Sequence, residues 1–186
     1  MSYIDDIKAY VPFNEQERKD KELILNCINT YDNILTRSNP LVHITSSGYI
    51  VNKTRNKVLM VFHNIYNSWS WTGGHADGEE NLLKVAIKEA QEETGINNLR
   101  LLYPGIFSLD VITVEGHIKK DEYISSHLHL SICYLLEGDE SEKLYIKEDE
   151  NSDVSWVNIE EVNKYSTEPK MIKIYNKFHK KLKTLL

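Results

Sequence analysis

The chain has 186 residues, 41% of them hydrophobic, so it is long enough for one globular domain with a core and too short to require two. Its 28 acidic residues exceed its 22 lysines and arginines, and this net charge of −6 argues against a long nucleic-acid partner, which would be bound by many cations. No apolar run approaches the roughly 18 residues of a membrane span, and two cysteines are too few for a disulfide framework, so we expect a soluble cytoplasmic protein with no membrane partner.

The N-terminal region is predicted to be helical. Apolar side chains recur every three to four positions over residues 14–35, and Asn14 and Glu17 have the spacing of a capping box at the start. We therefore treat residues 1–40 as a helical extension packed on a domain that covers residues 41–186. The long helix is also a candidate contact for a homodimer.

A β-hairpin and a second helix are expected next. Two β-rich runs, 43–51 and 57–62, flank a short polar turn and predict a hairpin. The helix is predicted over residues 81–94, and Gly95 stands where a left-handed helix terminator belongs.

The C-terminal half returns to strands and ends in a helix. Alternating patterns predict strands at 107–114 and 127–136, joined by a polar loop at 116–126, and a short last strand at 154–157. Pro169 then opens a closing amphipathic helix. This order of elements indicates an α+β fold, a mixed sheet with helices on its faces.

The helix at 81–94 is the most informative segment. It follows the glycine-rich stretch Gly73-Gly74 and carries Glu89, Glu92 and Glu93 at positions i, i+3 and i+4, which share roughly one face of one turn. Neighbouring carboxylates repel one another and, near a helix C-terminus, they oppose the helix dipole. A solvated acidic face is one interpretation. A hard divalent cation such as Mg²⁺, which prefers oxygen ligands, is the other.

The same segment resembles the Nudix box, G-x5-E-x7-R-E-U-x-E-E-x-G-U, in which U is a bulky aliphatic residue. Its fixed positions match, in order, Gly74, Glu80, Glu89, Glu92, Glu93, Gly95 and Ile96. One charged position departs from the box, since Lys88 stands where the family has Arg and lacks its planar bidentate fork. The resemblance implies a MutT-like hydrolase with an α/β (α+β) fold, the Nudix-type α/β/α sandwich with a mixed sheet.

The resemblance also implies a set of metal ligands. Glu92 and Glu93 are similar in position to the principal ligands of the family, and Glu89 to a further ligand or to the base that deprotonates the attacking water. The backbone carbonyl of Gly73 corresponds to another ligand. Family members often add one acid from the loop before the last strand. Here Glu150 is the first choice and Glu148 the second, unless that loop is only an exposed acidic turn.

The remaining catalytic assignments concern charge and cofactor. Glu80 corresponds to the residue that pairs with the arginine of the box, so its partner here would be Lys88. The implied reaction is attack of water on the phosphorus of a pyrophosphate bond, with Mg²⁺ or Mn²⁺ as cofactor and a small nucleotide-type molecule as substrate.

Weaker signals are candidates for substrate binding. His127 and His129 alternate with apolar residues and project from one face of a strand, where they would line a substrate pocket or chelate a transition metal, although a polar strand face is the favoured interpretation. His75 would contact phosphate or cap its loop. Trp71 would stack on a base or belong to the core.

Two other functions compete with hydrolysis. A non-catalytic Nudix-type nucleotide sensor would bind nucleotide without turnover, and Lys88 keeps that alternative open. An isoprenoid-diphosphate isomerase-like enzyme is disfavoured, because Cys27 precedes the glutamate helix and Cys133 lies in an apolar strand.

Overall fold

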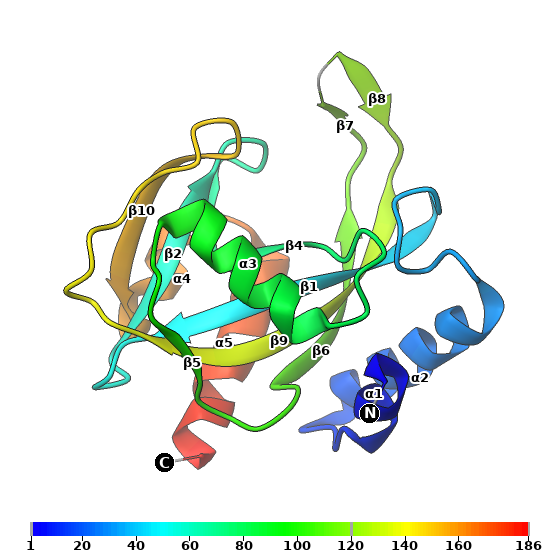
Figure 1. Ribbon diagram of the computed structural model, residues 1–186, viewed down its shortest axis with the longest axis horizontal. Coiled ribbons are helices and arrows are strands. Elements are labelled where there is room, and N and C mark those ends of the chain that lie inside the picture. The colour runs from blue at the N-terminus through cyan, green and yellow to red at the C-terminus, as the bar shows by residue number, and fades with distance from the viewer. Residues whose placement is uncertain (1, 120, 186) are drawn as a thin grey trace. The chain divides into compact units, whose positions relative to one another are not determined.

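A computed structural model of the protein describes residues 2–119 and 121–185 (Figure 1). The chain divides into two compact units. Unit 1 consists of Met1–Ser47, Gly73–Ala86 and Gly105–Tyr134, and unit 2 consists of Gly48–Thr72, Ile87–Pro104 and Leu135–Leu186.

Two helices open unit 1. The first, α1 (Tyr3–Ala9), was not predicted; it begins at a capping box in which the Ser2 side chain accepts a hydrogen bond from the Asp5 amide. The second, α2 (Glu15–Thr30), begins at the expected cap Asn14. It ends at Thr30 and not near residue 35 as predicted, because the backbone becomes extended at Tyr31.

Glu17 fixes α2 against the neighbouring strand. Its buried carboxylate accepts hydrogen bonds from the Phe13 amide at 2.7 Å and from the Ser108 hydroxyl at 2.9 Å. Ser108 is the first residue of β6 (Ser108–Val114), so an acid near the start of the helix is satisfied partly by the strand.

The strands of unit 1 include two antiparallel pairs. β6 pairs with β9 (His127–Gly138), close to the two strands predicted there. The predicted polar loop between them was wrong, because it contains the hairpin of β7 (His117–Lys119) and β8 (Glu122–Ile124), which extends beyond β6 and β9 (Figure 1). A two-stranded ribbon exposes both faces, so its polar sequence does not alternate as a half-buried strand does.

A close approach of backbones requires glycine in β4 (Thr72–His75), which pairs with β1 (Val42–Val51). A Cβ atom added to Gly73 would lie 2.6 Å from the Cβ of Ser47 and 2.9 Å from the Ser46 carbonyl oxygen. Since both neighbours are parts of β1, no side chain fits at Gly73 without moving that strand.

One eight-stranded mixed sheet has the strand order β10-β2-β1-β9-β5, in which β3 also pairs with β2, β4 with β1 and β6 with β9, and in which β1 and β9 run in the same direction (Figure 1). The strands not yet bounded are β2 (Lys57–His63), β3 (Ser68–Ser70), β5 (Leu99–Leu101) and β10 (Asn151–Asn158). The pairing of Val51 with Val58 confirms the predicted hairpin of β1 and β2. The apolar centre of β2 is completely buried, so this strand lies in the core.

The C-terminal helices belong to unit 2. After a short 3-10 turn (Ile159–Glu161), α4 (Val162–Tyr165) precedes α5 (Pro169–Thr184), which begins with the proline that the sequence predicts for a helix start. The apolar stripe of α5 is buried at Met171, Tyr175, Phe178 and Leu182.

The predicted α+β class with a mixed sheet is confirmed. The glutamate helix is α3 (Leu82–Thr94), and Gly95 has the expected positive φ of 74°. Among the described residues, no helix is both long and apolar enough to cross a membrane.

Candidate functional site

Within unit 2, three carboxylates converge from two segments of chain. Glu89 and Glu93 come from consecutive turns of α3, and Glu150 comes from the loop before β10. One oxygen from each lies within 4.8 Å of the others. Glu93 is 4% exposed, and the other two are partly buried. We call these three residues the carboxylate group.

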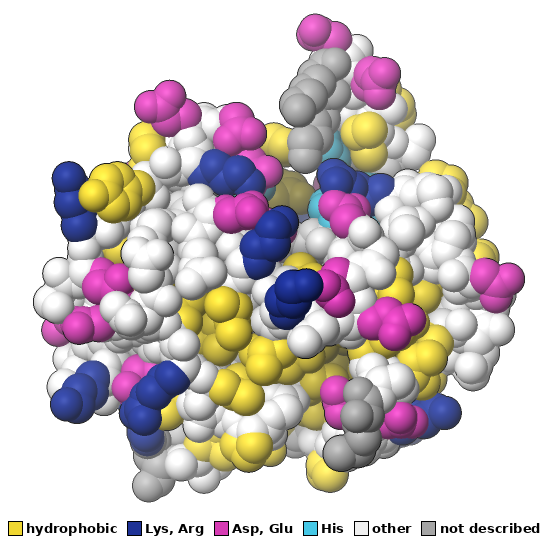
Figure 2. Space-filling view, in the orientation of Figure 1, with side chains coloured by type: hydrophobic (Ala, Val, Ile, Leu, Met, Phe, Trp, Pro, Cys, Tyr) yellow, Lys and Arg dark blue, Asp and Glu magenta, His cyan; other side chains and the backbone are white. Residues whose placement is uncertain are grey.

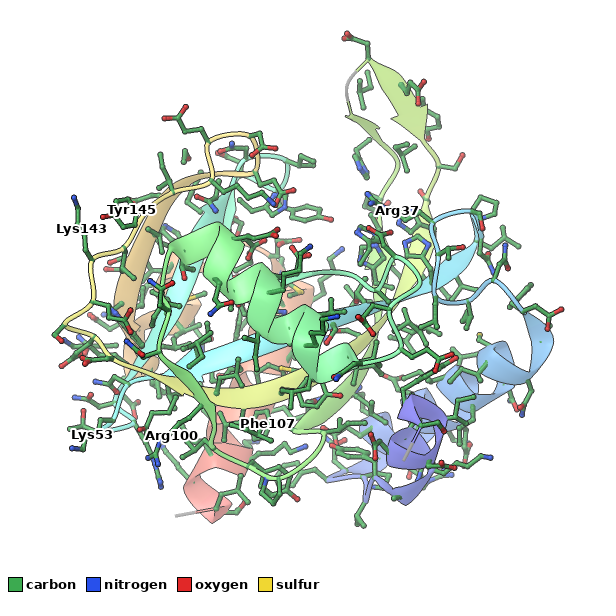
Figure 3. All side chains as sticks on the ribbon, viewed as in Figure 1. Arg37, Lys53, Arg100, Phe107, Lys143 and Tyr145 are labelled. Carbon is green, nitrogen blue, oxygen red and sulfur yellow. The ribbon has the colours of Figure 1, made fainter. Side chains whose placement is uncertain are left out.

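The end of α3 holds the loop that carries Glu150. The Tyr145 amide donates to the Thr94 carbonyl at 2.8 Å, and the Asn151 side chain donates to the Glu93 carbonyl at 3.0 Å. Lys143 and Tyr145, labelled in Figure 3, lie on this loop with the ammonium 4.9 Å from the ring centroid. The loop is therefore attached to the helix on both sides of Glu150.

Gly95 makes room for that attachment. A Cβ atom at Gly95 would lie 2.6 Å from Cδ2 of Tyr145 and 3.2 Å from its backbone nitrogen. The residue thus ends the helix in a conformation that suits glycine and lets the Tyr145 backbone approach. The glycine that the sequence assigns to helix termination also shapes the site.

Two lysines surround the carboxylates. Lys88 lies 3.3 Å from Glu92 and 3.7 Å from Glu89, and Lys147 lies 3.0 Å from Glu150 and 3.5 Å from Glu92. Figure 2 shows basic and acidic side chains next to each other over α3. Glu92, predicted as a principal ligand, is thus paired with both lysines, and its side chain is 41% exposed.

Burial and charge act in opposite directions on Glu89. Burial raises the pKa of its carboxyl above the usual value, and the ammonium of Lys88 opposes that rise. In turn, Glu89 and Glu92 raise the pKa of Lys88. Closely spaced oxygen donors, one of them almost fully buried, match the chemistry of a hard divalent cation.

The other residues predicted near the metal belong to unit 1. Gly73 lies in β4, and Glu80 lies just before α3, where its carbonyl accepts from the Leu82 amide at 3.1 Å. Their predicted roles, as a carbonyl ligand and as the partner of Lys88, stay predictions.

Trp71 occupies a core position in unit 2. The residue is 9% exposed, and its ring packs against Tyr175 and Phe178 of α5, with centroids 5.1 and 5.2 Å away. Its backbone amide donates to the Tyr175 hydroxyl at 3.2 Å. Of the two interpretations of Trp71, this packing favours the core role.

Unit 1 contains a second convergent cluster, made of imidazoles. His43 in β1, His75 in β4 and His129 in β9 each place a ring nitrogen within 4.8 Å of the others. We call these three residues the histidine group. His127 lies beside it, with its Nε2 3.1 Å from Nε2 of His129.

Sequence reasoning missed His43, which is 4% exposed. Its Nδ1 lies 3.1 Å from the Asn39 carbonyl, whereas its Nε2 is buried without a hydrogen-bond partner among the described residues. An unsatisfied buried polar atom costs about 1–3 kcal/mol. A histidine at the start of an apolar strand was the available signal, but nothing in the sequence places it near His129.

Comparison with known sequences identifies the chain's relatives. The model of the NUDIX domain family matches residues 42–178. The RNA pyrophosphohydrolase of Pelagibacter ubique (strain HTCC1062) is 27% identical over 144 residues, which cover 75% of this chain and 90% of the relative. A probable DHNTP pyrophosphohydrolase of Lactococcus lactis subsp. cremoris (strain MG1363) is 26% identical over 139 residues, covering 75% and 80%.

Solved structures agree on the fold. A NUDIX family hydrolase from Clostridium perfringens aligns with a TM-score of 0.54 at 22% identity, covering 77% of this chain and 98% of that one. The C. elegans Ap4A hydrolase binary complex aligns with a TM-score of 0.54 at 17% identity, covering 76% and 98%. The M. smegmatis Nudix hydrolase RenU gives 0.57 at 14% identity, covering 77% and 88%.

Proposed function

This chain belongs to the NUDIX domain family, and we infer that it is a pyrophosphohydrolase that uses a divalent metal, Mg²⁺ or Mn²⁺. The observation that supports the metal requirement is the convergence of the carboxylate group, Glu89, Glu93 and Glu150, on one small volume. Two of these acids come from a helix and one from a distant loop, and their closely spaced oxygen atoms suit a hard divalent cation, which would add to the ammonium groups of Lys88 and Lys147 beside them.

The donor set fits the cofactor. A bound Mg²⁺ polarises phosphate oxygens and lowers the pKa of its water. We assign Glu93 and Glu150 to holding the ion. Glu92 stays in the proposed ligand set, but it has two lysine partners that it would have to give up when the metal binds. Glu93 is therefore the more important ligand of the predicted pair.

We assign the proton-accepting role to Glu89. Burial raises the pKa of its carboxyl, which makes the group a stronger base than an exposed glutamate. Lys88 lies within ion-pair distance of Glu89 and Glu92, so it supports their orientation from the position that the arginine occupies in the family box. The proton of the attacking water passes to Glu89, and the protein contributes position and charge.

The substrate class is proposed from the relatives' names and from charge. The two sequence relatives are named pyrophosphohydrolases of RNA and of DHNTP, a name that refers to cleavage of a phosphoanhydride bond. The net charge of −6 favours a small nucleotide-type substrate over a long RNA. We propose a nucleoside diphosphate linked to another moiety, such as a nucleoside triphosphate or a nucleotide sugar. The free thiols Cys27 and Cys133 suit a cytoplasmic location.

A panel of nucleoside diphosphate derivatives tests this function. Each compound is incubated with the full chain and Mg²⁺ or Mn²⁺, and the products are separated by chromatography. The decisive variants are Glu150→Gln and its neighbour Asp149→Asn, an exposed residue of the same loop. We expect Glu150→Gln to lower kcat/KM more than about tenfold and Asp149→Asn to leave it unchanged. Equal rates in the two variants, or no turnover of any compound by the wild type, would contradict the proposal.

A further inference from the structure

The histidine group of unit 1 is organised in the manner of a metal site. The protonation of His43 is fixed by its surroundings: its Nδ1 faces the Asn39 carbonyl at 3.1 Å, and a carbonyl only accepts, so the proton is on Nδ1. The lone pair is therefore on Nε2, the buried atom for which the described residues supply no hydrogen-bond partner. Metal-ligating histidines commonly donate their other N–H to a backbone carbonyl in this way.

Three strands bring the three imidazole rings together. The ring of His43 lies 4.9 Å from that of His75 and 5.0 Å from that of His129, and the rings of His75 and His129 are 5.0 Å apart. Their ligand atoms lie within 4.8 Å of one another. Nitrogen ligands of a tetrahedral zinc ion are about 3.4 Å apart, so shifts of about an ångström or less complete the geometry.

His127 repeats the arrangement of His43. Its Nδ1 lies 2.8 Å from the Ser125 carbonyl, which places the proton on Nδ1 and the lone pair on Nε2. That Nε2 faces Nε2 of His129 at 3.1 Å. A second imidazole with a fixed tautomer therefore stands next to the group.

The charges near the group offset each other. Arg37, labelled in Figure 3, donates to both carboxylate oxygens of Asp77, at 2.9 and 2.5 Å. This bidentate pair neutralises the guanidinium, the cation that would otherwise repel a metal ion.

We propose that His43, His75 and His129 bind a first-row transition-metal dication such as Zn²⁺, at a site separate in chemistry from the carboxylate group. Neutral imidazoles suit zinc, nickel and copper, whereas Mg²⁺ prefers oxygen donors. Three protein ligands leave one coordination position open for water, an exogenous ligand or His127.

Cobalt is the direct probe of this site. Full-length protein is freed of metal with a chelator, titrated with Co²⁺ in the presence of excess Mg²⁺, and followed by visible absorption, after which Zn²⁺ is added in competition. We expect one equivalent of Co²⁺ to give the intense absorption of a tetrahedral nitrogen-ligated ion, and Zn²⁺ to abolish it. His43→Gln, His75→Gln and His129→Gln should each weaken binding more than about 100-fold.

A histidine outside the group provides the matched control. His179 of α5 is partly buried and bonded to the Tyr49 hydroxyl at 2.7 Å, and His179→Gln should leave the cobalt spectrum and affinity unchanged. Near-ultraviolet circular dichroism checks that each variant is folded. If His43→Gln does not fold, His75→Gln decides the matter, because His75 is only partly buried.

Three results would overturn the proposal. One is the absence of tetrahedral absorption in the wild type. Another is a wild-type affinity for Co²⁺ in folded His75→Gln or His129→Gln. The last is loss of the spectrum in Glu93→Gln, which would place the cobalt at the carboxylate group. None of these results depends on hydrolytic activity, so the proposal stands or falls separately from the proposed function.

Discussion

The carboxylate group of unit 2 and the histidine group of unit 1 are two convergent clusters with opposite electrostatics. The carboxylates carry like charges, and Lys88 and Lys147 lie within ion-pair distance of them or of Glu92. Burial lowers the pKa of His43 and lowers that of His129 to about 2, which favours the neutral forms of these two imidazoles. The comparison teaches that the charge of the ligands decides how a cluster is stabilised without metal. Ammonium groups offset the charge of the carboxylates, whereas burial favours the neutral form of the imidazoles.

The largest effect is expected from Glu93→Gln. Glu93 is 4% exposed, and the change removes a negative charge from the place where the cation is proposed to bind. We expect kcat/KM with Mg²⁺ to fall more than about 100-fold. Glu92→Gln should cost less, since lysines already share that carboxylate. Steady-state kinetics of both variants on one substrate measures the difference.

The comparison would fail if Glu92→Gln were the more damaging change. In that case the ion pairs of Glu92 with Lys88 and Lys147 would be replaced by metal ligation, and the static charge arrangement would not predict the ligand order. The cobalt spectrum of the histidine group should be the same in both variants.

Acid should destabilise the protein through His179, whose imidazole is hydrogen-bonded to the Tyr49 hydroxyl. Burial lowers the pKa of His179 to about 4, below the ~6.5 of an unfolded chain. The stability that neutral His179 contributes is therefore complete above about pH 6.5 and is lost as the pH falls to about 4. The reason is that His179 binds a proton at a higher pH in the unfolded chain than in the folded protein. Over this pH range we expect the free energy of unfolding to fall by about 2 kcal/mol more in the wild type than in His179→Gln, after allowing for the partial exposure of His179.

Urea unfolding at closely spaced pH values measures that difference. Parallel curves for wild type and His179→Gln would show that Tyr49 and the surrounding core do not hold His179 neutral. His179 could then no longer serve as the example of a histidine kept neutral by burial with which the histidine group is compared.

Gly95→Ala, at the end of the helix that carries the carboxylates, should destabilise the protein. The new Cβ meets Tyr145, and the φ of 74° disfavours alanine, so we expect unfolding to become easier by about 1–2 kcal/mol. Gly78→Ala is the control, because Gly78 has a φ of 89° and no atom within 4 Å of the added Cβ. Thermal and urea unfolding should show a larger loss for Gly95→Ala, and equal losses would show that Tyr145 yields freely.

The smallest effect is expected from Lys147→Met. The ammonium competes with a metal for Glu92 and Glu150, so its removal should tighten Mg²⁺ binding about two- to fivefold, the range of exposed ion pairs. Lys143→Met, on the same loop but placed over Tyr145, should have no effect. Calorimetric titration without substrate measures both, and weaker binding in Lys147→Met would refute competition.

The strongest predictions from sequence were those with a local cause. The period of a helix places Glu89 and Glu93 one above the other. Because glycine has no Cβ atom, Gly95 can adopt the positive φ that terminates α3. The hairpin of β1 and β2 and the class of the fold follow from alternation and turn residues in the same way. The short hairpin of β7 and β8 did not, because ribbons exposed on both faces have no apolar period.

The sequence by itself determined which side chains share a helical turn and which family the chain resembles. The resemblance offered Glu150 or Glu148 as a further acid, and the tertiary structure brings Glu150 to Glu89 and Glu93. Only the tertiary structure decided that Glu92 pairs with two lysines and that His43 lies beside His75 and His129. The physical reason is range: helix geometry relates residues three or four positions apart, whereas sheet order and loop attachment join residues that are tens of positions apart, through contacts that no local pattern records.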